Sequence, residues 1–440
     1  MKQVMILPPA TIGILGGGQL GMYLALTAKQ FGYKVAVLEP DPHCPAKRAA
    51  DIHICKKYDD QEALKELAQY ADVITTEFEN VPASTVDYLN QFKPVYPQAS
   101  SLLIAQNRGK EKTFFRSCGL STADFVLISQ IQDCRNIKAE MFPAILKTTT
   151  LGYDGKGQVK VMRASELEDA YIQLAHPECI LEKMVSLQHE VSVIVARNQT
   201  GSNTFPVLEN HHRNGILEIS YIPAAIAPEL ISQAEQAAHL IVEKLDYIGL
   251  LTIEFFVTCD GQLLVNEIAP RPHNSGHITL DSTITSQFEQ QLRAVCGLNL
   301  GSTSLKQNGA MLNLLGDVWL DPSLNPFEIM INNHSDSKLY LYGKTQAKSG
   351  RKMGHLTICN DSRKELEKQM GEKKKIIEFK YKFQQEQAKE QAETARQKQK
   401  SAIDKKKKEL EEIIKAKKKI IELQKKGKKI PQELIAKAKG

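Results

Sequence analysis

Two glutamates, Glu254 and Glu267, lie at a spacing that suits metal binding. They belong to two strand-like runs, LLTIEFFV and LLVNEIA, on either side of the dipeptide Asp260-Gly261. This dipeptide favours a two-residue type I′ hairpin turn, because both central positions of that turn need a positive φ. Pairing Cys259 with Gln262 then places Glu254 directly opposite Glu267, with Cβ atoms roughly 5 Å apart. Two carboxylates this close repel each other, and a magnesium ion that also binds substrate phosphates would remove the repulsion.

A short loop rich in polar side chains follows this hairpin. The segment APRPHNSGH comes directly after Ile268 and carries Arg271, His273, Asn274 and His277. An ordinary surface hairpin, whose two glutamates have separate lysine partners, is the other interpretation of the region. So many polar donors in one proline-stiffened loop favour a binding or catalytic site.

A glycine-bearing loop with two lysines is a second candidate for nucleotide binding. A strand-like run ends at Lys147, and the segment LGYDGKGQ follows before the next strand-like run, Val159–Val161. Such an unhindered backbone can fold over phosphates, and Lys147 and Lys156 add charge that suits a triphosphate. A long glycine-bearing hairpin without function is the alternative.

The N-terminal region has the pattern of a βαβ unit. A strand-like run at 11–15 leads into GGGQLG and a helical run, and a second strand-like run at 34–38 ends at Glu39. This pattern is typical of dinucleotide binding. The same glycine turn could instead bind another anion, such as a ribonucleotide phosphate, at the helix N-terminus.

Further strand-like runs at 72–76 and 94–96 predict a small doubly wound sheet of about 100 residues. Glu77 and Glu79 follow the first of these runs, at the strand end where such sheets bind ligands. The alternative is that both acids are favoured only by the dipole of a following helix.

Composition and charge limit the remaining function classes. The chain has 440 residues, 42% of them hydrophobic, which allows two or three domains. Its eight cysteines form no CxxC pair and no apolar run approaches the roughly 20 residues of a membrane span, which predicts a cytoplasmic protein with reduced thiols. Residues 371–440 hold 23 Lys and Arg against 11 Asp and Glu, so the rest of the chain has a net charge of −6. That acidic part does not predict nucleic-acid binding.

These motifs together resemble a known family. Paired glutamates on a hairpin ending in NE, followed by PRPHNSGH, are similar to the ATP-grasp ligases. The PRPHNSGH string is similar to the 5-(carboxyamino)imidazole ribonucleotide synthases of purine biosynthesis. The resemblance extends from about Thr11 to Met370.

The resemblance implies a mixed α/β and α+β architecture with an ATP-grasp fold. Its parts would be an N-terminal Rossmann-like (preATP-grasp) domain at 1–105, an ATP-grasp nucleotide-binding domain at 106–298, and a small C-terminal substrate-phosphate domain at 299–370. A lysine-rich helical tail at 371–440 lies outside the resemblance.

The implied activity is ATP-dependent carboxylation of 5-aminoimidazole ribonucleotide with bicarbonate. Carboxyphosphate would be the intermediate, and ADP and phosphate would be released. The implied cofactors are ATP and Mg²⁺, and the implied assembly is a homodimer with no membrane or nucleic-acid partner for the catalytic part.

The resemblance also implies roles for individual residues. Glu254 and Glu267 would bind magnesium, while Arg271, His273 and Asn274 would hold carboxyphosphate. Asp154 would be the base near the amine, and Tyr153 would orient it. The residues that would bind ATP are Arg108, Lys147, Gly152, Tyr153, Asp154, Gly155, Lys156, Gly157, Gln158, Glu182, Lys183, Met184, Val185, Glu190, His212, Asn266 and Glu267. The residues that would bind the ribonucleotide are Gly18, Gln19, Leu20 and Glu77, with Lys344, Arg351 and Lys352 at its phosphate. One departure is Met22, where the family commonly has arginine.

Three alternatives remain open at this point. A formate-using ribonucleotide transformylase of the same superfold would differ mainly around the PRPH loop, and HNSGH argues against it. An NAD-dependent oxidoreductase rests on the glycine turn and Glu39. A non-catalytic polyanion-binding protein would combine the basic tail with a decayed ligase, although every metal and phosphate residue sought is present.

The tail is rich in Lys, Glu, Gln and Ala, which are good helix formers. One or two charged helices are predicted, ending near Gly427, with a further short helix starting at Pro431. Its apolar residues are too sparse for a sustained heptad seam, so we expect it to add little to the core. A solvated helix, a weak coiled coil and a polyanion-binding arm are its candidate roles, in that order.

Overall fold

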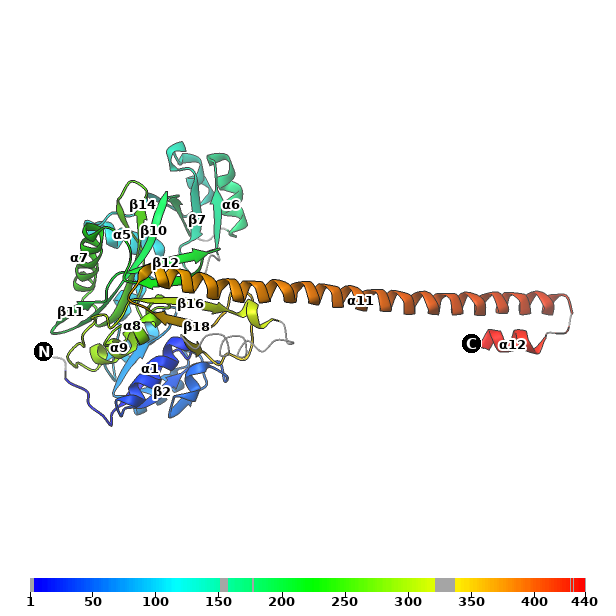
Figure 1. Cartoon of the computed structure of the whole chain (residues 1–440), viewed down its shortest axis with the longest axis horizontal. Coiled ribbons are helices and arrows are strands. Elements are labelled where there is room, and N and C mark those ends of the chain that lie inside the picture. The colour runs from blue at the N-terminus through cyan, green and yellow to red at the C-terminus, as the bar shows by residue number, and fades with distance from the viewer. Residues whose placement is uncertain are drawn as a thin grey trace. The chain divides into compact units, whose positions relative to one another are not determined.

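A computed structural model of this chain describes residues 4–150, 157–175, 178–320, 337–427, 429 and 431–439. The chain forms two units (Figure 1). The first reaches Glu372, and the second takes in the chain from Lys373 onward. All candidate site residues that the structure describes belong to the first unit.

The N-terminal region is a parallel sheet in the order β3-β2-β1-β4-β5. The strands TIGIL and KVAVL are almost wholly buried, as expected where helices cover both faces of a parallel sheet. The doubly wound sheet predicted for this region is therefore confirmed. Its strands are β1 (Thr11–Leu15), β2 (Lys34–Leu38), β3 (Ile52–Ile54), β4 (Val73–Thr76) and β5 (Val95–Tyr96). Its helices are α1 (Gln19–Gln30), η1 (Pro45–Arg48), α2 (Gln61–Tyr70), α3 (Ala83–Leu89) and α4 (Ala99–Ala105).

A second, antiparallel sheet has the order β6-β9-β7-β8. Lys147 at the end of β7 pairs with Gln158 at the start of β8, so the strands on both sides of the predicted glycine loop are neighbours. These strands are β6 (Phe125–Ile128), β7 (Ala144–Thr148), β8 (Gln158–Val161) and β9 (Cys179–Lys183). The helices are α5 (Arg108–Ser117), η2 (Ile131–Asn136), η3 (Ala139–Met141), η4 (Ala164–Glu166) and α6 (Leu167–Gln173).

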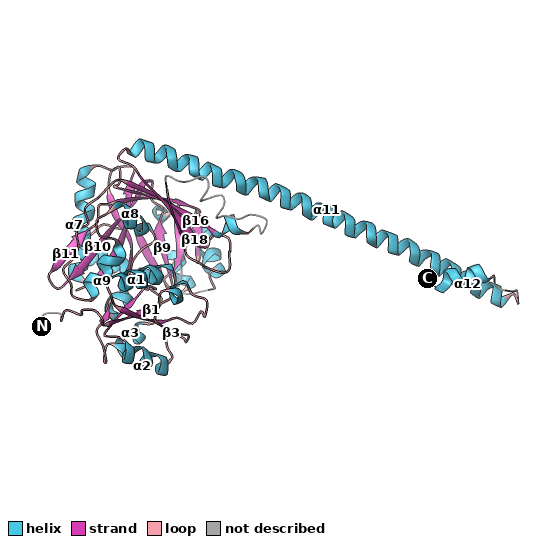
Figure 2. Ribbon diagram, turned by 60° about the horizontal axis from the view of Figure 1, so that its bottom comes forward, coloured by secondary structure: helices cyan, strands magenta, loops and turns pink. Residues whose placement is uncertain are grey.

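A large antiparallel sheet carries the predicted metal hairpin, with β14 between β10 and β15. Figure 2 shows strands β10, β16 and β18 of this sheet. Helix α7 packs its alanine and isoleucine face on this sheet and shares one apolar core with it. The strands are β10 (Leu187–Asn198), β11 (Gly201–Thr204), β12 (Leu208–Arg213), β13 (Ile216–Ile222), β14 (Gly249–Thr258), β15 (Leu263–Ala269), β16 (Gly309–Leu315), β17 (Lys338–Leu341) and β18 (Lys352–Cys359). The helices are α7 (Pro228–Lys244), η5 (Ser275–Ile278), α8 (Thr279–Ser282), α9 (Gln287–Val295) and η6 (Gly316–Trp319).

The predicted type I′ turn of the β14–β15 hairpin is wrong. Thr258 N donates to Gln262 O at 2.9 Å, and only Gly261 of the intervening residues has a positive φ, +78°. This is a three-residue loop, so Val257 faces Leu263 rather than Leu264. A bulge between Val265 and Glu267 shifts the register back, and Glu254 pairs with Glu267 as predicted.

The described part of the second unit is helical, and its first helix begins within the first unit. Helix α11 (Arg363–Lys425) is followed by Gly427 at φ +63°, and α12 (Gln432–Lys439) starts directly after Pro431. The predicted tail helices are therefore confirmed, although α11 starts eight residues before the predicted tail. None of the described helices is long and apolar enough to cross a membrane.

Candidate active site

The glutamate pair lies at the edge of the large sheet. The side chain of Glu254 is 14% exposed, whereas Glu267 is exposed to solvent. Burial, followed by the charge of Glu267, raises the pKa of Glu254 to about 7. Both effects disfavour the negative charge of Glu254, and a cation bound beside it would stabilise that charge.

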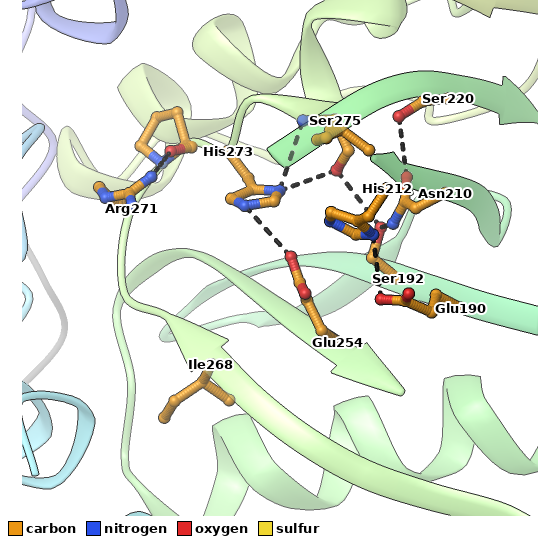
Figure 3. Close-up of polar contacts among 12 residues, drawn as sticks. Glu190, Ser192, Asn210, His212, Ser220, Glu254, Ile268, Arg271, His273 and Ser275 are labelled. Atoms are coloured by element: carbon orange, nitrogen blue, oxygen red, sulfur yellow. Dashed lines mark hydrogen bonds and ion pairs between the residues drawn. The ribbon is translucent and has the colours of Figure 1, made fainter. Parts of the chain in front are cut away.

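His273 links this carboxylate to the PRPHNSGH loop. Its Nε2 lies 3.3 Å from Glu254 Oε1, and its Nδ1 lies 2.9 Å from Ser275 Oγ (Figure 3). Burial, and then the positive charges of Arg271 and Lys352, hold the pKa of His273 well below its usual range. His273 is therefore neutral, with Nε2–H directed to the carboxylate and Nδ1 accepting from the serine hydroxyl.

A chain of hydroxyl and amide groups supports this histidine on the Nδ1 side of its ring. Ser275 Oγ lies 3.3 Å from Ser192 Oγ, which accepts from Asn210 Nδ2 at 2.9 Å. Ser220 Oγ then donates to Asn210 Oδ1 at 2.8 Å (Figure 3). These serines and Asn210 are buried, so the chain fixes the loop against strands β10, β12 and β13.

Glu190 and His212 form an ion pair on neighbouring strands, with 2.9 Å between Oε2 and Nδ1. Burial opposes a charge on His212, but the hydrogen bond with Glu190 and the carboxylate of Glu254 raise its pKa above the usual range. These two residues, both predicted to contact the nucleotide, are thus brought together on the side of the site that holds Glu254 (Figure 3).

Two lysines flank Glu182 on strand β9, of which Lys112 is buried and Lys147 half-buried. Lys147 Nζ lies 3.2 Å from Glu182 Oε1, and Lys112 Nζ lies 3.5 Å from Glu182 Oε2. Burial opposes ionisation of Glu182, but these two ammonium groups hold its pKa below the usual range. Lys112 also donates to Asn266 Oδ1 at 3.4 Å, so one buried cation connects the nucleotide strand to the metal hairpin.

Sequence reasoning missed Lys112 and its neighbour Glu111. Glu111 Oε1 accepts a hydrogen bond of 2.7 Å from Ile268 N, next to the metal ligand candidate Glu267. Lys112 follows Arg108 by four residues on α5, and this spacing places both on one helix face. This spacing relative to Arg108, a predicted ATP-binding residue, was the signal in the sequence that could have identified Lys112. Arg108 itself donates to Thr148 O at 3.0 Å, beside Lys147.

The glycine turn of the first domain is occupied by the chain's own carboxylates. Glu77 accepts from Gly18 N at 2.7 Å and from Gly21 N at 3.1 Å, while Glu39 accepts from Gly17 N at 2.8 Å. Burial raises the pKa of Glu77 to about 7, against the effect of these N–H donors. A dinucleotide pyrophosphate would have to displace two carboxylates, so the predicted NAD alternative does not fit this turn.

Gln19 starts helix α1, directly after Gly18. The next residue, Leu20, is 6% exposed and packs in the apolar core, so only its backbone can reach a ligand. Met22 packs in the same core. The side chain at this position therefore makes no substrate contact here.

The predicted phosphate-binding residues lie together around β17 and β18. Lys344 Nζ donates to Lys352 O at 2.7 Å, and Arg351 donates to Gln346 O at 2.8 Å. Arg48 of η1 reaches Gly343 O at 3.1 Å, which ties this segment to the N-terminal domain. Burial opposes ionisation of Glu79, but the charges of Arg271 and then Lys352 hold its pKa below the usual range.

Arg271 connects the PRPHNSGH loop to the N-terminal domain. Its Nε donates to a carboxylate oxygen of Glu79, and its NH1 donates to Pro272 O at 3.0 Å. Asn274 is 6% exposed, and both polar atoms of its side chain are buried without a protein hydrogen-bond partner among the described residues. A buried amide without partners is costly, so this position is suited to a polar ligand.

Several predicted residues remain to be placed. Gly152, Tyr153, Asp154, Gly155 and Lys156 lie outside the described residues. Gly157 has φ +69°, and its carbonyl accepts from Thr148 N at 2.9 Å.

The segment from Glu182 to Val185, which is predicted to bind ATP, begins at the end of β9. The backbone N–H groups of Lys183 and Met184 donate to Asp124 O and Pro143 O, each at 2.9 Å. These bonds hold the segment against the smaller sheet.

The residues present fit a magnesium ion. Within the described ranges no group of three or more His, Cys, Asp or Glu side chains is arranged to hold a metal ion. A site of two carboxylates completed by substrate phosphates needs no such group. The raised pKa of Glu254 is the observation that favours a cation there.

Comparisons with known proteins agree with this geometry. The ATP-grasp domain family matches residues 113–288, the ribonucleotide synthetase preATP-grasp domain matches residues 9–106, and the phosphoribosylaminoimidazole carboxylase C-terminal domain matches residues 309–369. The chain is 45% identical over 364 residues to the N5-carboxyaminoimidazole ribonucleotide synthase of Bacillus subtilis strain 168, covering 81% of this chain and 93% of that protein.

Solved structures give the same result. A crystal structure of the ADP complex of an N5-carboxyaminoimidazole ribonucleotide synthetase is 42% identical, with a TM-score of 0.81, and the match covers 88% of this chain and 100% of that one. The Aspergillus clavatus synthase in complex with ADP and 5-aminoimidazole ribonucleotide is 27% identical, with a TM-score of 0.77 over 84% of this chain and 98% of that one.

The fold and the site thus define an ATP-grasp enzyme, an ATP-dependent carbon–nitrogen ligase with a preATP-grasp domain before it and a small domain after it. Within this class the chain belongs to the N5-carboxyaminoimidazole ribonucleotide synthase family. The resemblance identified in the sequence is confirmed. The alternatives of an NAD-dependent oxidoreductase and of a non-catalytic protein are wrong, and the alternative of a transformylase is not supported.

Proposed function

We propose that this chain carboxylates 5-aminoimidazole ribonucleotide with bicarbonate at the expense of ATP, giving 5-(carboxyamino)imidazole ribonucleotide, ADP and phosphate. The observation that carries the proposal is the placement of Arg271. Its charge acts on the glutamate of the metal hairpin and on the carboxylates beside the glycine turn. A carboxylate-sized substrate held there would lie between a nucleotide and a ribonucleotide.

Bicarbonate would attack the γ-phosphate of ATP, forming carboxyphosphate and ADP. Such a transfer depends mostly on positioning and on charge neutralisation. Arg271 can bind the anionic carboxyl and phosphoryl oxygens, and His273 would join it once its Nε2–H turns from Glu254 to the substrate. The amide of Asn274 has no hydrogen-bond partner among the described residues, which supports a role for it in the same binding.

Lys147 and Arg108 would neutralise the ATP phosphates, with the glycine loop over them. Glu190 would bind the ribose hydroxyls, and His212 would make a further contact with the nucleotide. A magnesium ion held by Glu254 and Glu267 would supply charge neutralisation of the phosphoryl oxygens. The high pKa of Glu254 supports this assignment, because a cation would favour its ionised form.

The ribonucleotide would bind between the glycine turn and the segment from Lys344 to Lys352. Glu77 would orient the aminoimidazole, and the basic residues Lys344, Arg351 and Lys352 would hold the phosphate by charge-assisted hydrogen bonds. Asp154 would accept the amine proton and Tyr153 would orient the amine. The amine then captures the carboxyl of carboxyphosphate and releases phosphate.

A homodimer and a cytoplasmic location are part of the proposal. All eight cysteines are free thiols, which is typical of a reducing compartment. Sedimentation of the purified protein tests the dimer.

The experiment that tests the function measures ADP release with and without aminoimidazole ribonucleotide and bicarbonate. We expect release to require both, with carboxylated product formed in equal amount. Formate, offered in place of bicarbonate, should give no product. ADP release with formate and formylated product would support the transformylase instead.

A further inference from the structure

The ion pair between Glu79 and Arg271 joins two parts of the site that have different tasks. Arg271 belongs to the loop after β15 and interacts electrostatically with Glu254, whereas Glu79 belongs to the loop after β4, two residues beyond Glu77. Both side chains are largely buried, at 27% exposure for Glu79 and 16% for Arg271. Few solvent contacts therefore compete with the pair.

The electrostatic surroundings make this pair strong. Burial opposes a charge on Arg271, but the carboxylates of Glu79, Glu77 and Glu254 raise its pKa. Burial likewise opposes ionisation of Glu79, but Arg271 and then Lys352 hold its pKa below the usual range. Both partners are charged at neutral pH.

The pair also occupies one edge of the guanidinium, the edge that contains Nε, to which a planar anion could bind. A guanidinium binds carboxylate-like groups through two parallel N–H donors. Here Nε is engaged by Glu79, and NH1 donates to the carbonyl of Pro272. Bicarbonate has the same O–C–O arrangement as the Glu79 carboxylate, so the two compete for Arg271.

The loop that carries Glu79 is held at both ends. Glu77 is bonded to the N–H groups of Gly18 and Gly21, where the aminoimidazole ribonucleotide is proposed to bind. Gln106 Nε2 donates to the carbonyls of Glu79 and Val81, at 2.6 and 2.7 Å. Because Glu79 follows Glu77 by two residues in the same loop, a ligand that moves Glu77 also moves Glu79.

We propose that Glu79 is a positioning residue that holds Arg271 away from bicarbonate until the ribonucleotide binds, so that ATP is not cleaved without an acceptor. Ribonucleotide binding at the glycine turn draws the Glu79 loop back and frees Arg271. The inference rests on the proposed function, because it needs bicarbonate as the ligand of Arg271.

The test compares Glu79→Gln with the unaltered protein and with Glu62→Gln, which alters an exposed ion pair with Lys65 in the same domain. ADP release is measured with saturating ATP and bicarbonate, first without and then with aminoimidazole ribonucleotide. In Glu79→Gln we expect ribonucleotide-independent release to rise at least about threefold and the KM for bicarbonate to fall by a similar factor. The KM for ATP should change less.

Two results would overturn the proposal while leaving the function intact. One is an unaltered protein that needs both substrates, with Glu79→Gln unchanged in ribonucleotide-independent release and in the KM for bicarbonate. The other is a uniform loss of turnover in Glu79→Gln with the same bicarbonate KM, which is a merely structural effect. ADP release by the unaltered protein without bicarbonate would instead refute the proposed function, and with it the proposed role of Glu79.

A second variant guards against misfolding. If Glu79→Gln does not fold, Glu79→Asp keeps the charge but draws it back from Arg271 by one methylene. It should give an intermediate rise in ribonucleotide-independent release. If a folded Glu79→Asp protein shows no rise in ribonucleotide-independent ADP release, the proposed role of Glu79 is wrong.

Discussion

Glu254 lies directly opposite Glu267 across strands β14 and β15, with a bulge between this pair and the hairpin loop. Replacing Glu267 with Gln keeps the shape but removes one anionic ligand from the proposed magnesium site. ATP turnover should fall at least about 100-fold, or roughly 2.7 kcal/mol in barrier. Circular dichroism should show an intact fold. Asp260→Asn, at the exposed tip of the same hairpin, should retain activity, and near-normal turnover in Glu267→Gln would mean that the metal binds elsewhere.

The pH dependence of stability should report on Glu254. Its pKa of about 7 in the folded protein lies above the ordinary value of 4.5, so the folded state binds more protons between these pH values. Its contribution to stability is therefore fully present below about pH 4.5 and lost as the pH rises to about 7.

Glu254→Gln removes this dependence. Relative to the unaltered protein, the variant should gain stability as the pH rises from 5 to 8, by at most about 3 kcal/mol. Urea unfolding at pH 5, 6, 7 and 8 measures the difference, with Glu62→Gln as the exposed control. A difference that stays constant with pH would contradict the assigned pKa.

Lys112 should matter for both stability and nucleotide binding. Lys112→Met leaves Glu182 paired with Lys147 and removes a donor to Asn266. We expect a loss of about 1 to 3 kcal/mol in unfolding free energy and weaker ATP binding. Lys110→Met, an exposed change on the same helix, is the matched control. Equal effects of both variants would show that the buried pair has no special role.

Dinucleotides should not bind the glycine turn. Its N–H groups are engaged by Glu39 and Glu77, so NAD should give no rise in melting temperature at concentrations where magnesium-ATP does. Differential scanning fluorimetry makes the comparison. A clear upward shift with NAD would show that these carboxylates are displaced by a pyrophosphate.

Catalysis should not need the basic tail. Truncation after Glu372 removes the second unit and should leave turnover within about twofold, under half a kcal/mol in barrier. Any polyanion binding should disappear with the tail, and in the full chain it should weaken steeply with salt. A folded truncated protein that loses more than about tenfold in turnover would show that the tail takes part in the reaction.

Local patterns in the sequence determined much of this protein. Strand periodicity predicted β1, β2, β4 and β14, and the helix formers of the tail predicted α11 and α12. The paired glutamates followed from counting along two strands. These features depend on residues close in the chain, so composition and spacing are sufficient to predict them.

The tertiary structure decided which groups meet across long distances in sequence. Glu79 and Arg271 are 192 residues apart, and Glu111 and Ile268 are 157 apart, so no local pattern could pair them. The bulge that restores the glutamate register also depends on packing beyond the hairpin itself. The glycine turn shows the same limit: its spacing predicted an anion site, but the fold brings Glu39 and Glu77 to its N–H groups, because β2 and β4 end beside it.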